Sequence, residues 1–311
     1  MAAEGADTDL SADLFDAESR VWVESLLARC TFPNGTSPLR CAVSGGADSV
    51  AMLVLAMLAG HSVVVVHVDH GIQETSSADA LLVGALAERL GVPFELHTVS
   101  VTDGPNLEAR ARKARYLALG PDSVVAHTAD DRAEWVLIAL MRGSGMDGIA
   151  AMHPARRPVL GLRRGETRDL CRLLDLETVD DPHNHDDRFV RIRVRRELLP
   201  LMGDIAGRDV APLLDRLASI VSDEIDLLDG LAADLDPTDA RALAAAPVGL
   251  ARRAVRAWLR ADHPLDLAST DRVLDVAAGR SLATEIVGGR RVWRSGQRLH
   301  VGGPISAASV P

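Results

Sequence analysis

Residues 40–50 read R-C-A-V-S-G-G-A-D-S-V, in which a short apolar run passes through two adjacent glycines into the start of a helical pattern. Glycines let the backbone turn so that successive N–H groups, reinforced by a helix N-terminus, converge on an anion. The two serine hydroxyls supply further donors. The pattern predicts a phosphate-binding loop made of Ser44, Gly45, Gly46, Ala47, Asp48 and Ser49.

This loop has no lysine, which distinguishes it from the G-x-x-x-x-G-K-[ST] phosphate loop. We therefore expect Asp48 to recruit Mg²⁺, which offsets the charge of the phosphates. The residues alone leave one alternative open. In that alternative the glycines form a tight turn, and Asp48 or Ser49 caps a helix without binding a ligand.

Short β-branched runs alternate with longer helical ones on either side of the loop, from about residue 39 to residue 162. Such alternation predicts an α/β domain with a doubly wound, mostly parallel five-stranded sheet. Ligands then bind at the carboxyl ends of the strands, where the winding reverses. The predicted strands are residues 40–43, 62–68, 93–99, 123–127 and 158–162, and the helices start near Ala47, Ser76, Asn106 and Ala129.

The strand signal fades after Pro200, and residues 211–231 and 248–259 have the periodicity of amphipathic helices. We therefore expect a second, smaller and mainly helical domain, in which apolar runs around Gly296 predict a short hairpin. The predicted organisation is an acidic, disordered N-terminal segment at 1–20, a catalytic α/β domain at 21–205 and a helical domain at 206–311.

Charge is unevenly distributed along the chain. The formal net charge is −10, which disfavours a polyanionic partner unless acidic and basic regions are segregated. Segregation is present, because residues 204–239 are acidic whereas residues 188–196 hold five arginines and no acid. Lys113 is the only lysine, so the cationic sites offer the planar, bidentate geometry of arginine.

The three cysteines, Cys30, Cys41 and Cys171, are widely spaced and form no C-x-x-C pair. This spacing argues against a zinc ribbon, an iron–sulfur site or a disulfide framework, and it favours a reducing compartment. The N-terminus lacks a basic segment followed by an apolar one, and no apolar run approaches the roughly 20 residues of a bilayer span. We therefore expect a cytoplasmic protein.

The string S-G-G-x-D-S after a first buried strand resembles the pyrophosphate loop (PP-loop) of the ATP pyrophosphatase superfamily, which has an adenine nucleotide α hydrolase-like fold. Six further motifs follow it in order, and together they resemble the tRNA(Ile)-lysidine synthase family between residues 40 and 200. The motifs are H-V-D-H-G at 67–71, N-L-E-A-R-A-R-K-A-R-Y at 106–116, H-T-A-D-D-R-A-E at 127–134, R-G-S-G-M-D-G-I-A-A-M at 142–152, D-P-H-N at 181–184 and R-I-R-V-R-R-E-L-L-P at 191–200.

The resemblance implies a carbon–nitrogen ligase that acts in tRNA modification with ATP and Mg²⁺. Such an enzyme adenylates the C2 carbonyl oxygen of the wobble cytidine in a tRNA(Ile) with a CAU anticodon and releases pyrophosphate. The ε-amine of free L-lysine then displaces AMP, which gives lysidine. The resemblance also makes a homodimer a reasonable expectation and implies that the helical domain assists tRNA binding.

Asp131 and Glu134 lie three residues apart at the start of a predicted helix, so they share one face at the carboxyl end of the fourth strand. A carboxylate pair suits an incoming ammonium and could also accept protons as the amine attacks. The alternative is that acids in a first helical turn only complement the helix dipole. His127 and Asp130 are weaker candidates for a catalytic role. A histidine at the end of a strand is often only packed against the core, and Asp130 could simply cap the helix.

Asp69 and His70 follow the second strand, close to the expected position of the adenine or the substrate carbonyl; a simple strand-ending turn is the alternative. Arg112 and Arg115 on the helix after the third strand could contact phosphates, although surface helices also carry arginine for solubility. The catalytic residues predicted in total are Asp48, Asp69, His70, Asp131, Glu134, Arg191 and Arg195.

Arg188, Arg191 and Arg195 fall within a narrow arc of a predicted helix, which Arg193 and Arg196 widen. The alternative is a solvated charged face. The segment matches the R-N-x-x-R string of the resembled family, which assigns catalysis and tRNA binding to Arg191 and Arg195. It departs from that string at Ile192, where asparagine is usual. The predicted tRNA-binding residues are Arg112, Arg115, Arg188, Arg191, Arg193 and Arg195.

Three other functions share the predicted loop. A tRNA thiolase generally relies on cysteines to deliver sulfur, and this chain has no cysteine pair. Amide-forming relatives that use glutamine ammonia need an amidotransferase domain or partner. A non-catalytic nucleotide-binding module would bind ATP without releasing pyrophosphate.

Overall fold

The computed structural model describes residues 15–35, 37–69, 76–99, 107–150, 152–179, 187–260 and 265–303. The chain divides into two compact units, Met1–Ser219 and Ile220–Pro311, and the division falls inside the long helix α10 (Ala211–Ala233). The predicted N-terminal segment lies mostly outside the described residues, and helix α1 (Ala17–Leu27) begins within its last part.

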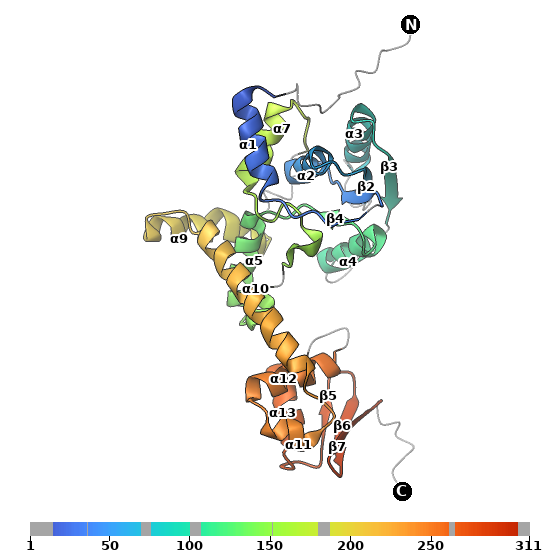
Figure 1. Ribbon diagram of the computed structural model, residues 1–311, viewed down its shortest axis with the longest axis vertical. Coiled ribbons are helices and arrows are strands. Elements are labelled where there is room, and N and C mark those ends of the chain that lie inside the picture. The colour runs from blue at the N-terminus through green and yellow to red at the C-terminus, as the bar shows by residue number, and fades with distance from the viewer. Residues whose placement is uncertain are drawn as a thin grey trace. The chain divides into compact units, whose positions relative to one another are not determined.

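The first unit contains a four-stranded parallel sheet with the order β3-β2-β1-β4 (Figure 1). The chain moves outward from β1 to β2 and β3 and then returns to place β4 on the other side of β1, which confirms the predicted doubly wound fold. In the register, Cys41 of β1 pairs with Val65 and Val124. The strands are β1 (Leu39–Ala42), β2 (Val63–Asp69), β3 (Phe94–Thr98) and β4 (Val124–Val125).

Helices cover both faces of this sheet, because the residues of β2 alternate between two cores. Val63 and Val65 belong to the core that also includes residues of α2 and α3, whereas Val66 and Val68 pack with Leu119 of α4. All four predicted helix starts are confirmed to within one residue. These helices are α2 (Ala47–Leu58), α3 (Ser76–Arg89), α4 (Leu107–Leu119) and α5 (Ala129–Met141).

The predicted fifth strand at 158–162 is wrong. This segment forms turns, with hydrogen bonds from Leu160 N to Arg157 O and from Leu162 N to Val159 O. Val159 and Leu162 are fully buried, so the apolar run does belong to the core. Burial of a short apolar run does not by itself specify a strand, and Pro158 lacks the N–H that a ladder requires. The turn leads directly into helix α7 (Arg164–Leu173), which packs against α2.

A stretch of π-helix, η4 (Val194–Leu198), lies between α8 (Val190–Arg193) and α9 (Leu199–Ala206). Val194 packs against Leu137 and Ile138 of α5. Ile192, the position where the resembled family has asparagine, is buried and so offers only apolar packing. Anchoring by these apolar residues places the arginines of the same segment beside the first turns of α5. Two short elements, α6 (Met146–Ile149) and the 3₁₀ turn η2 (Pro154–Arg156), connect α5 to the segment before α7.

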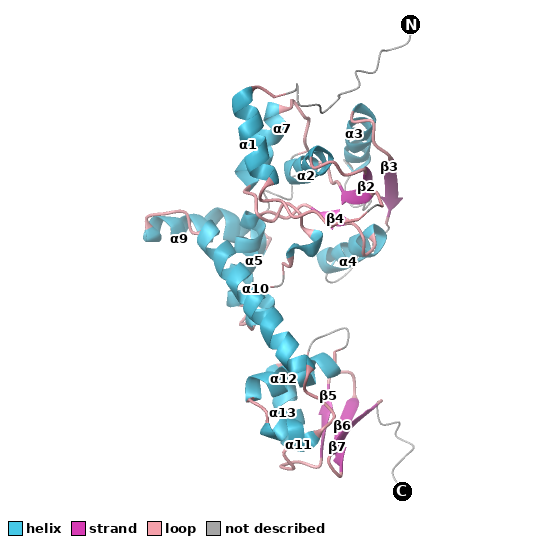
Figure 2. Ribbon diagram, in the orientation of Figure 1, coloured by secondary structure: helices cyan, strands magenta, loops and turns pink. Residues whose placement is uncertain are grey.

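The second unit has its own core, which includes the fully buried Val255, Leu259, Val273 and Val292. The predicted hairpin around Gly296 is confirmed as β6 and β7, and an unpredicted strand β5 extends it to a three-stranded antiparallel sheet (Figure 2). No helix in the described ranges is long and apolar enough to cross a bilayer. The elements are α11 (Ala240–Ala245), α12 (Val248–Trp258), α13 (Leu267–Ala277), β5 (Ala283–Ile286), β6 (Arg290–Ser295) and β7 (Arg298–Gly302).

Candidate active site

The loop between β1 and α2 has the geometry of an anion cradle. Gly45 adopts a φ of +91°, and Gly46 has an extended conformation as the N-cap of α2. Ser49 closes the turn, since its N–H and its hydroxyl both donate to Gly46 O, at 2.9 and 2.8 Å. Among the described residues, the N–H groups of Gly45, Gly46, Ala47 and Asp48 have no acceptor, so they are available to an anion.

The segment after α7 fastens this loop. Val179 N donates to Gly45 O at 2.9 Å, and a Cβ placed on Gly45 would come within 2.8 Å of Val179 Cγ2. Glycine is therefore required at position 45 for two reasons, the backbone conformation and the close approach of Val179.

We expect Gly45→Ala to lower the free energy of unfolding by about 1–2 kcal/mol through its left-handed conformation, and by more through the contact with Val179. Gly60→Ala is the matched control, because Gly60 has a φ of +84° and open space around it. Chemical denaturation of both variants, and of Gly45→Ala/Val179→Ala, separates the two costs. Equal losses in the two single variants would contradict the role of Val179.

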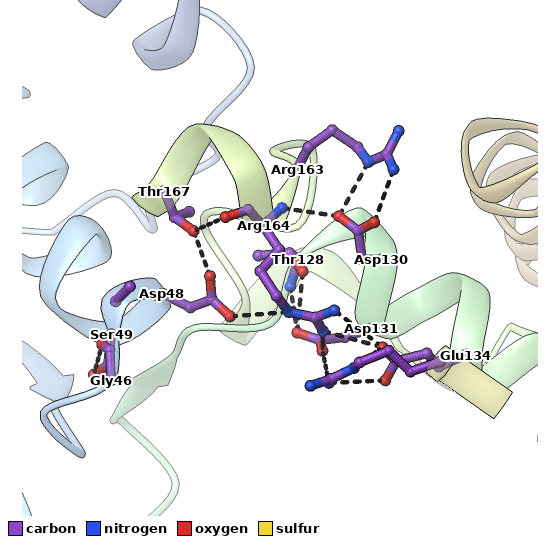
Figure 3. Close-up of polar contacts among 12 residues, drawn as sticks. Gly46, Asp48, Ser49, Thr128, Asp130, Asp131, Glu134, Arg163, Arg164 and Thr167 are labelled. Carbon is purple, nitrogen blue, oxygen red and sulfur yellow. Dashed lines mark hydrogen bonds and ion pairs between the residues drawn. The ribbon is translucent and has the colours of Figure 1, made fainter. Parts of the chain in front are cut away.

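Asp48, in the first turn of α2, is held by α7 (Figure 3). Thr167 Oγ1 donates to Asp48 Oδ1, and Arg164 Nε lies 3.7 Å from Asp48 Oδ2. Burial raises the pKa of Asp48, and the negative charge of Asp131 raises it further. The carboxylate keeps 24% of its side-chain surface exposed, so an incoming cation can reach it.

Asp131 and Glu134 lie together on α5, as the sequence pattern predicts. Asp131 Oδ2 accepts the N–H of Thr128 at 2.8 Å, which completes a capping box at the start of the helix. Glu134 is completely buried. Asp131 thus caps the start of its helix, a role that the sequence pattern did not predict, and its other oxygen remains available for further contacts.

Three arginines contact this acid pair, and Figure 3 labels one of them, Arg164. Arg164 from α7 pairs with Asp131 and reaches Glu134 at 3.1 Å. Arg191 contacts Asp131 at 2.6 Å and Glu134 at 2.7 Å. Arg195 contacts Glu134 at 2.7 Å and approaches Asp131 at 3.7 Å. Five charged side chains from three segments therefore form one cluster, in which the guanidiniums outnumber the carboxylates.

The electrostatics of this cluster keep Asp131 ionised. Burial alone would raise the pKa of Asp131, but the guanidiniums of Arg191 and Arg164 hold it well below the usual range of a carboxyl. A carboxylate with such a depressed pKa binds cations well and is a weak proton acceptor. The geometry therefore favours cation binding by Asp131 over general-base chemistry.

Asp130 anchors the start of α7. Both of its oxygens pair with Arg163, at 2.8 and 3.0 Å, and Oδ2 also accepts the backbone N–H of Arg164 at 2.8 Å. A cavity of about 470 Å³ lies beside Asp130 and Glu134. The cationic residues that line it include Arg163, Arg195 and Arg208. The cavity is the size of a small-molecule site and opens next to the acid pair.

Other predicted site residues lie farther from the acid pair than these arginines do, or they lie outside the described residues. Asp69 ends β2 next to the loop, and its backbone oxygen accepts Val99 N at 2.8 Å. His127 is buried, with its Nδ1 3.2 Å from Arg157 Nε. Arg115 stacks on Tyr116, 5.7 Å from the ring centroid. His70 and the side chain of Arg112 lie outside the described residues.

The arginine-rich segment separates into two groups. Arg191 and Arg195 turn inward to the acid pair, whereas Arg193 pairs with Glu197 at 2.8 Å and Arg196 with Asp187 at 3.3 Å on the exposed side. Arg188 precedes α8 and is exposed. The predicted stripe of Arg188, Arg191 and Arg195 is thus not continuous on one helix, because α8 begins only at Val190 and passes into π-helix at Val194.

Sequence reasoning missed Arg163, Arg164 and Thr167. They lie in the string R-R-G-E-T at 163–167, immediately after the buried run that resembled a strand. Nothing in the composition of that string distinguishes it from a solvated helix start, and only its packing against α2 and α5 reveals its contacts.

A doubly wound sheet whose first strand ends in a glycine cradle with a nearby carboxylate is typical of nucleotide-binding proteins, whose ligands lie at the carboxyl ends of the strands. The family model of the PP-loop domain matches residues 20–202. The chain is also similar to the U34-tRNA thiolase NcsA of Methanococcus maripaludis, with a TM-score of 0.54 over 67% of this chain and 82% of that one. At 14% identity, this likeness shows the fold alone.

Curated relatives define the family within this class. The chain is 43% identical over 244 residues to the tRNA(Ile)-lysidine synthase of Nocardia farcinica, covering 73% of this chain and 77% of the relative. It is 39% identical over 287 residues to that of Rhodococcus opacus, covering 84% and 88%. The Mycobacterium leprae enzyme is 41% identical over 238 residues, covering 70% and 73%. The chain belongs to the tRNA(Ile)-lysidine synthase family.

Proposed function

We propose that this chain ligates L-lysine to C2 of the wobble cytidine in a tRNA(Ile) with a CAU anticodon. The reaction proceeds through an adenylated tRNA and releases pyrophosphate and then AMP. The observation that carries the proposal is the acid pair Asp131 and Glu134, which Arg164 links to Asp48 of the PP-loop. Identities of 39–43% to curated family members over most of the chain support the same reaction.

The loop would hold the triphosphate of ATP through the N–H groups of residues 45–48. Asp48 would supply the protein ligand of Mg²⁺, which is usually bound by one or two carboxylates together with substrate phosphates. A single, partly exposed carboxylate beside an anion cradle fits that donor set. Bound Mg²⁺ would offset the charge that develops on the departing pyrophosphate.

The acid pair would bind the ammonium of lysine. An ammonium has three donors and no acceptor, which suits the carboxylate oxygens of Asp131 and Glu134, and Glu134 lines the cavity described above. The carboxylate of the amino acid needs a cation, which Arg163, Arg195 or Arg208 of the cavity lining can supply. The ammonium must first displace a guanidinium, because three arginines already pair with the acids.

The exposed arginines of the same segment would contact the tRNA. Arg188, Arg193 and Arg196 lie on the outer side of residues 187–198, while Arg191 keeps 38% of its side-chain surface exposed beside the acids. Phosphate contacts from this surface would bring the anticodon loop next to the site where ATP and lysine meet. Residues 187–198 would thus supply both the arginines that contact the tRNA and the arginines that contact the acid pair.

The decisive experiment measures products. With ATP, Mg²⁺, lysine and a tRNA bearing a CAU anticodon, we expect lysidine in the digested nucleosides by mass spectrometry and equimolar pyrophosphate. Ornithine in place of lysine and a UAU anticodon in place of CAU are the matched controls, and both should give little product. Pyrophosphate that forms equally well without tRNA would overturn the proposal.

The thiolase alternative lacks support from the cysteines. Burial raises the pKa of Cys41 and Cys171 to about 12, so both thiols stay protonated at neutral pH. Within the described ranges, no group of three or more histidines, cysteines or acids could hold a metal ion. Within the described residues, the cysteines therefore give no support to a persulfide-carrying or cluster-binding role.

A further inference from the structure

Arg164 occupies a junction between the ATP loop and the acid pair. It is the first residue of α7, and its backbone N–H is fixed by Asp130 at 2.8 Å. Its side chain is only 14% exposed and lies among three carboxylates that come from two helices. Asp48 belongs to α2, and Asp131 and Glu134 belong to α5.

The three arginines of the cluster are not equivalent. Among the described residues, Arg191 and Arg195 pair only with Asp131 and Glu134. Arg164 contacts the same acids and also extends its Nε to within 3.7 Å of Asp48. A change of charge at Asp48 therefore acts on the acid pair through Arg164, which contacts both. Arg191 and Arg195 have no such ion pair with Asp48 among the described residues.

Binding of an ammonium to this cluster is opposed as the cluster stands. Asp131 and Glu134 carry two negative charges, and three guanidiniums already compensate them. An ammonium that enters must displace at least one guanidinium or find one displaced. Phosphates seated on the loop beside Asp48 would attract a guanidinium strongly, because a triphosphate carries more negative charge than one carboxylate.

We propose that Arg164 is a positioning residue that couples the two small-molecule sites: nucleotide phosphates draw its guanidinium toward the loop, and the acid pair becomes free to hold lysine. This inference rests on the proposed function. It makes nucleotide binding favour lysine binding, and by linkage lysine favours nucleotide by the same factor. Arg164 acts through its charge on the acids and contacts neither the ε-amine of lysine nor C2 of the cytidine.

The test is a coupling measurement on the full chain without tRNA. The Kd of lysine is measured by titration calorimetry with and without a non-hydrolysable ATP analogue and Mg²⁺. For the parent protein we expect the analogue to tighten lysine binding about 10-fold, within the range usual for coupled sites. For Arg164→Met, which keeps an unbranched apolar side chain and removes the charge, the factor should fall to about 2-fold or less.

The direction in which the Kd of lysine changes in nucleotide-free Arg164→Met distinguishes a coupling role of Arg164 from a structural one. Without nucleotide, Arg164→Met should bind lysine at least as tightly as the parent, because one competing guanidinium is gone. Arg172→Met is the matched control, since Arg172 lies on the same helix and pairs with the exposed Asp169. It should keep the full coupling. Arg164→Lys retains the charge but cannot span three carboxylates, so its coupling should be reduced even if Arg164→Met fails to fold.

The outcomes that overturn the inference are distinct from those that overturn the proposed function. Full coupling in Arg164→Met and Arg164→Lys, or lysine binding weakened equally in both conditions, would remove Arg164 from this role. A parent protein that forms lysidine but shows no coupling would also reject the inference and leave the function intact. A parent protein that neither binds lysine nor forms lysidine would reject both.

Discussion

Replacing Asp48 with asparagine is expected to lower the rate of lysidine formation by a factor of about 10²–10³ while the protein stays folded. The substitution removes the carboxylate that the loop itself carries and leaves Arg164 without its partner on α2. Asparagine is nearly the same size and its carbonyl can still accept the hydroxyl of Thr167, so the packing of α7 on α2 should survive. Pyrophosphate release measured at saturating ATP, lysine and tRNA gives the effect.

Asp122→Asn is the control for this substitution. Asp122 is exposed and precedes β4, so it lies at the amino end of the sheet, opposite the loop. The same chemical change there should leave the rate within about 2-fold of the parent, because it touches no group of the site. Unchanged turnover in Asp48→Asn would remove Asp48 from the nucleotide site, whatever the result for Asp122→Asn.

Replacing Asp131 with asparagine is expected to lower the free energy of unfolding by about 3–5 kcal/mol at neutral pH, the usual cost of removing one partner from a buried ion pair. Asparagine keeps an oxygen for the N–H of Thr128, so the capping box can survive and the loss reports the charge. The substitution removes one of two carboxylate partners from Arg191 and one of three from Arg164, in a site where Asp131 is only 6% exposed. Urea denaturation measures the loss.

The difference in the free energy of unfolding between the parent and Asp131→Asn should also depend on pH, in a direction that the pKa of Asp131 determines. Because the pKa of Asp131 is depressed in the folded state, its charge contributes stability that is fully present above its ordinary pKa of 3.8. That contribution is lost as the pH falls from there toward the lower folded-state pKa. The gap in stability between the parent and Asp131→Asn should therefore be widest at neutral pH and should narrow below about pH 4.

Glu197→Gln is the control for the burial argument. Glu197 pairs with Arg193 at 2.8 Å with more than half of both side chains exposed, so its loss should leave the free energy of unfolding nearly unchanged. A loss in Asp131→Asn as small as that of Glu197→Gln, or one independent of pH, would show that the acid–arginine cluster contributes little to stability. It would also weaken the case that an ammonium must displace a guanidinium there.

The sheet and its first helices could be predicted from the sequence because local signals and tertiary packing agree in them. Residues 63–66 are four consecutive valines, and a strand buried on both faces is the structure that such a run favours. Residues 158–162 share that signal, yet they form buried turns. A short apolar run reports burial rather than backbone conformation, so the two cases were indistinguishable before the fold was seen.

The candidate site divides in the same way. The glycine cradle, Asp48 and the acid pair on α5 follow from contiguous residues, since each is set by a turn or by one helical repeat. The partners of the acids do not follow. Arg164 and Arg191 lie 33 and 60 residues from Asp131 along the chain, and three segments must pack together before their guanidiniums meet its carboxylate.

The sequence by itself determined the α/β class, the anion-binding loop and the face that Asp131 and Glu134 share, because these depend on contacts within a few residues. Only the tertiary structure decided that Arg164, Arg191 and Arg195 neutralise those acids and that Arg164 also reaches the loop. Ion pairs between segments distant along the chain depend on how helices pack. Composition and periodicity contain no information on the distances that packing creates.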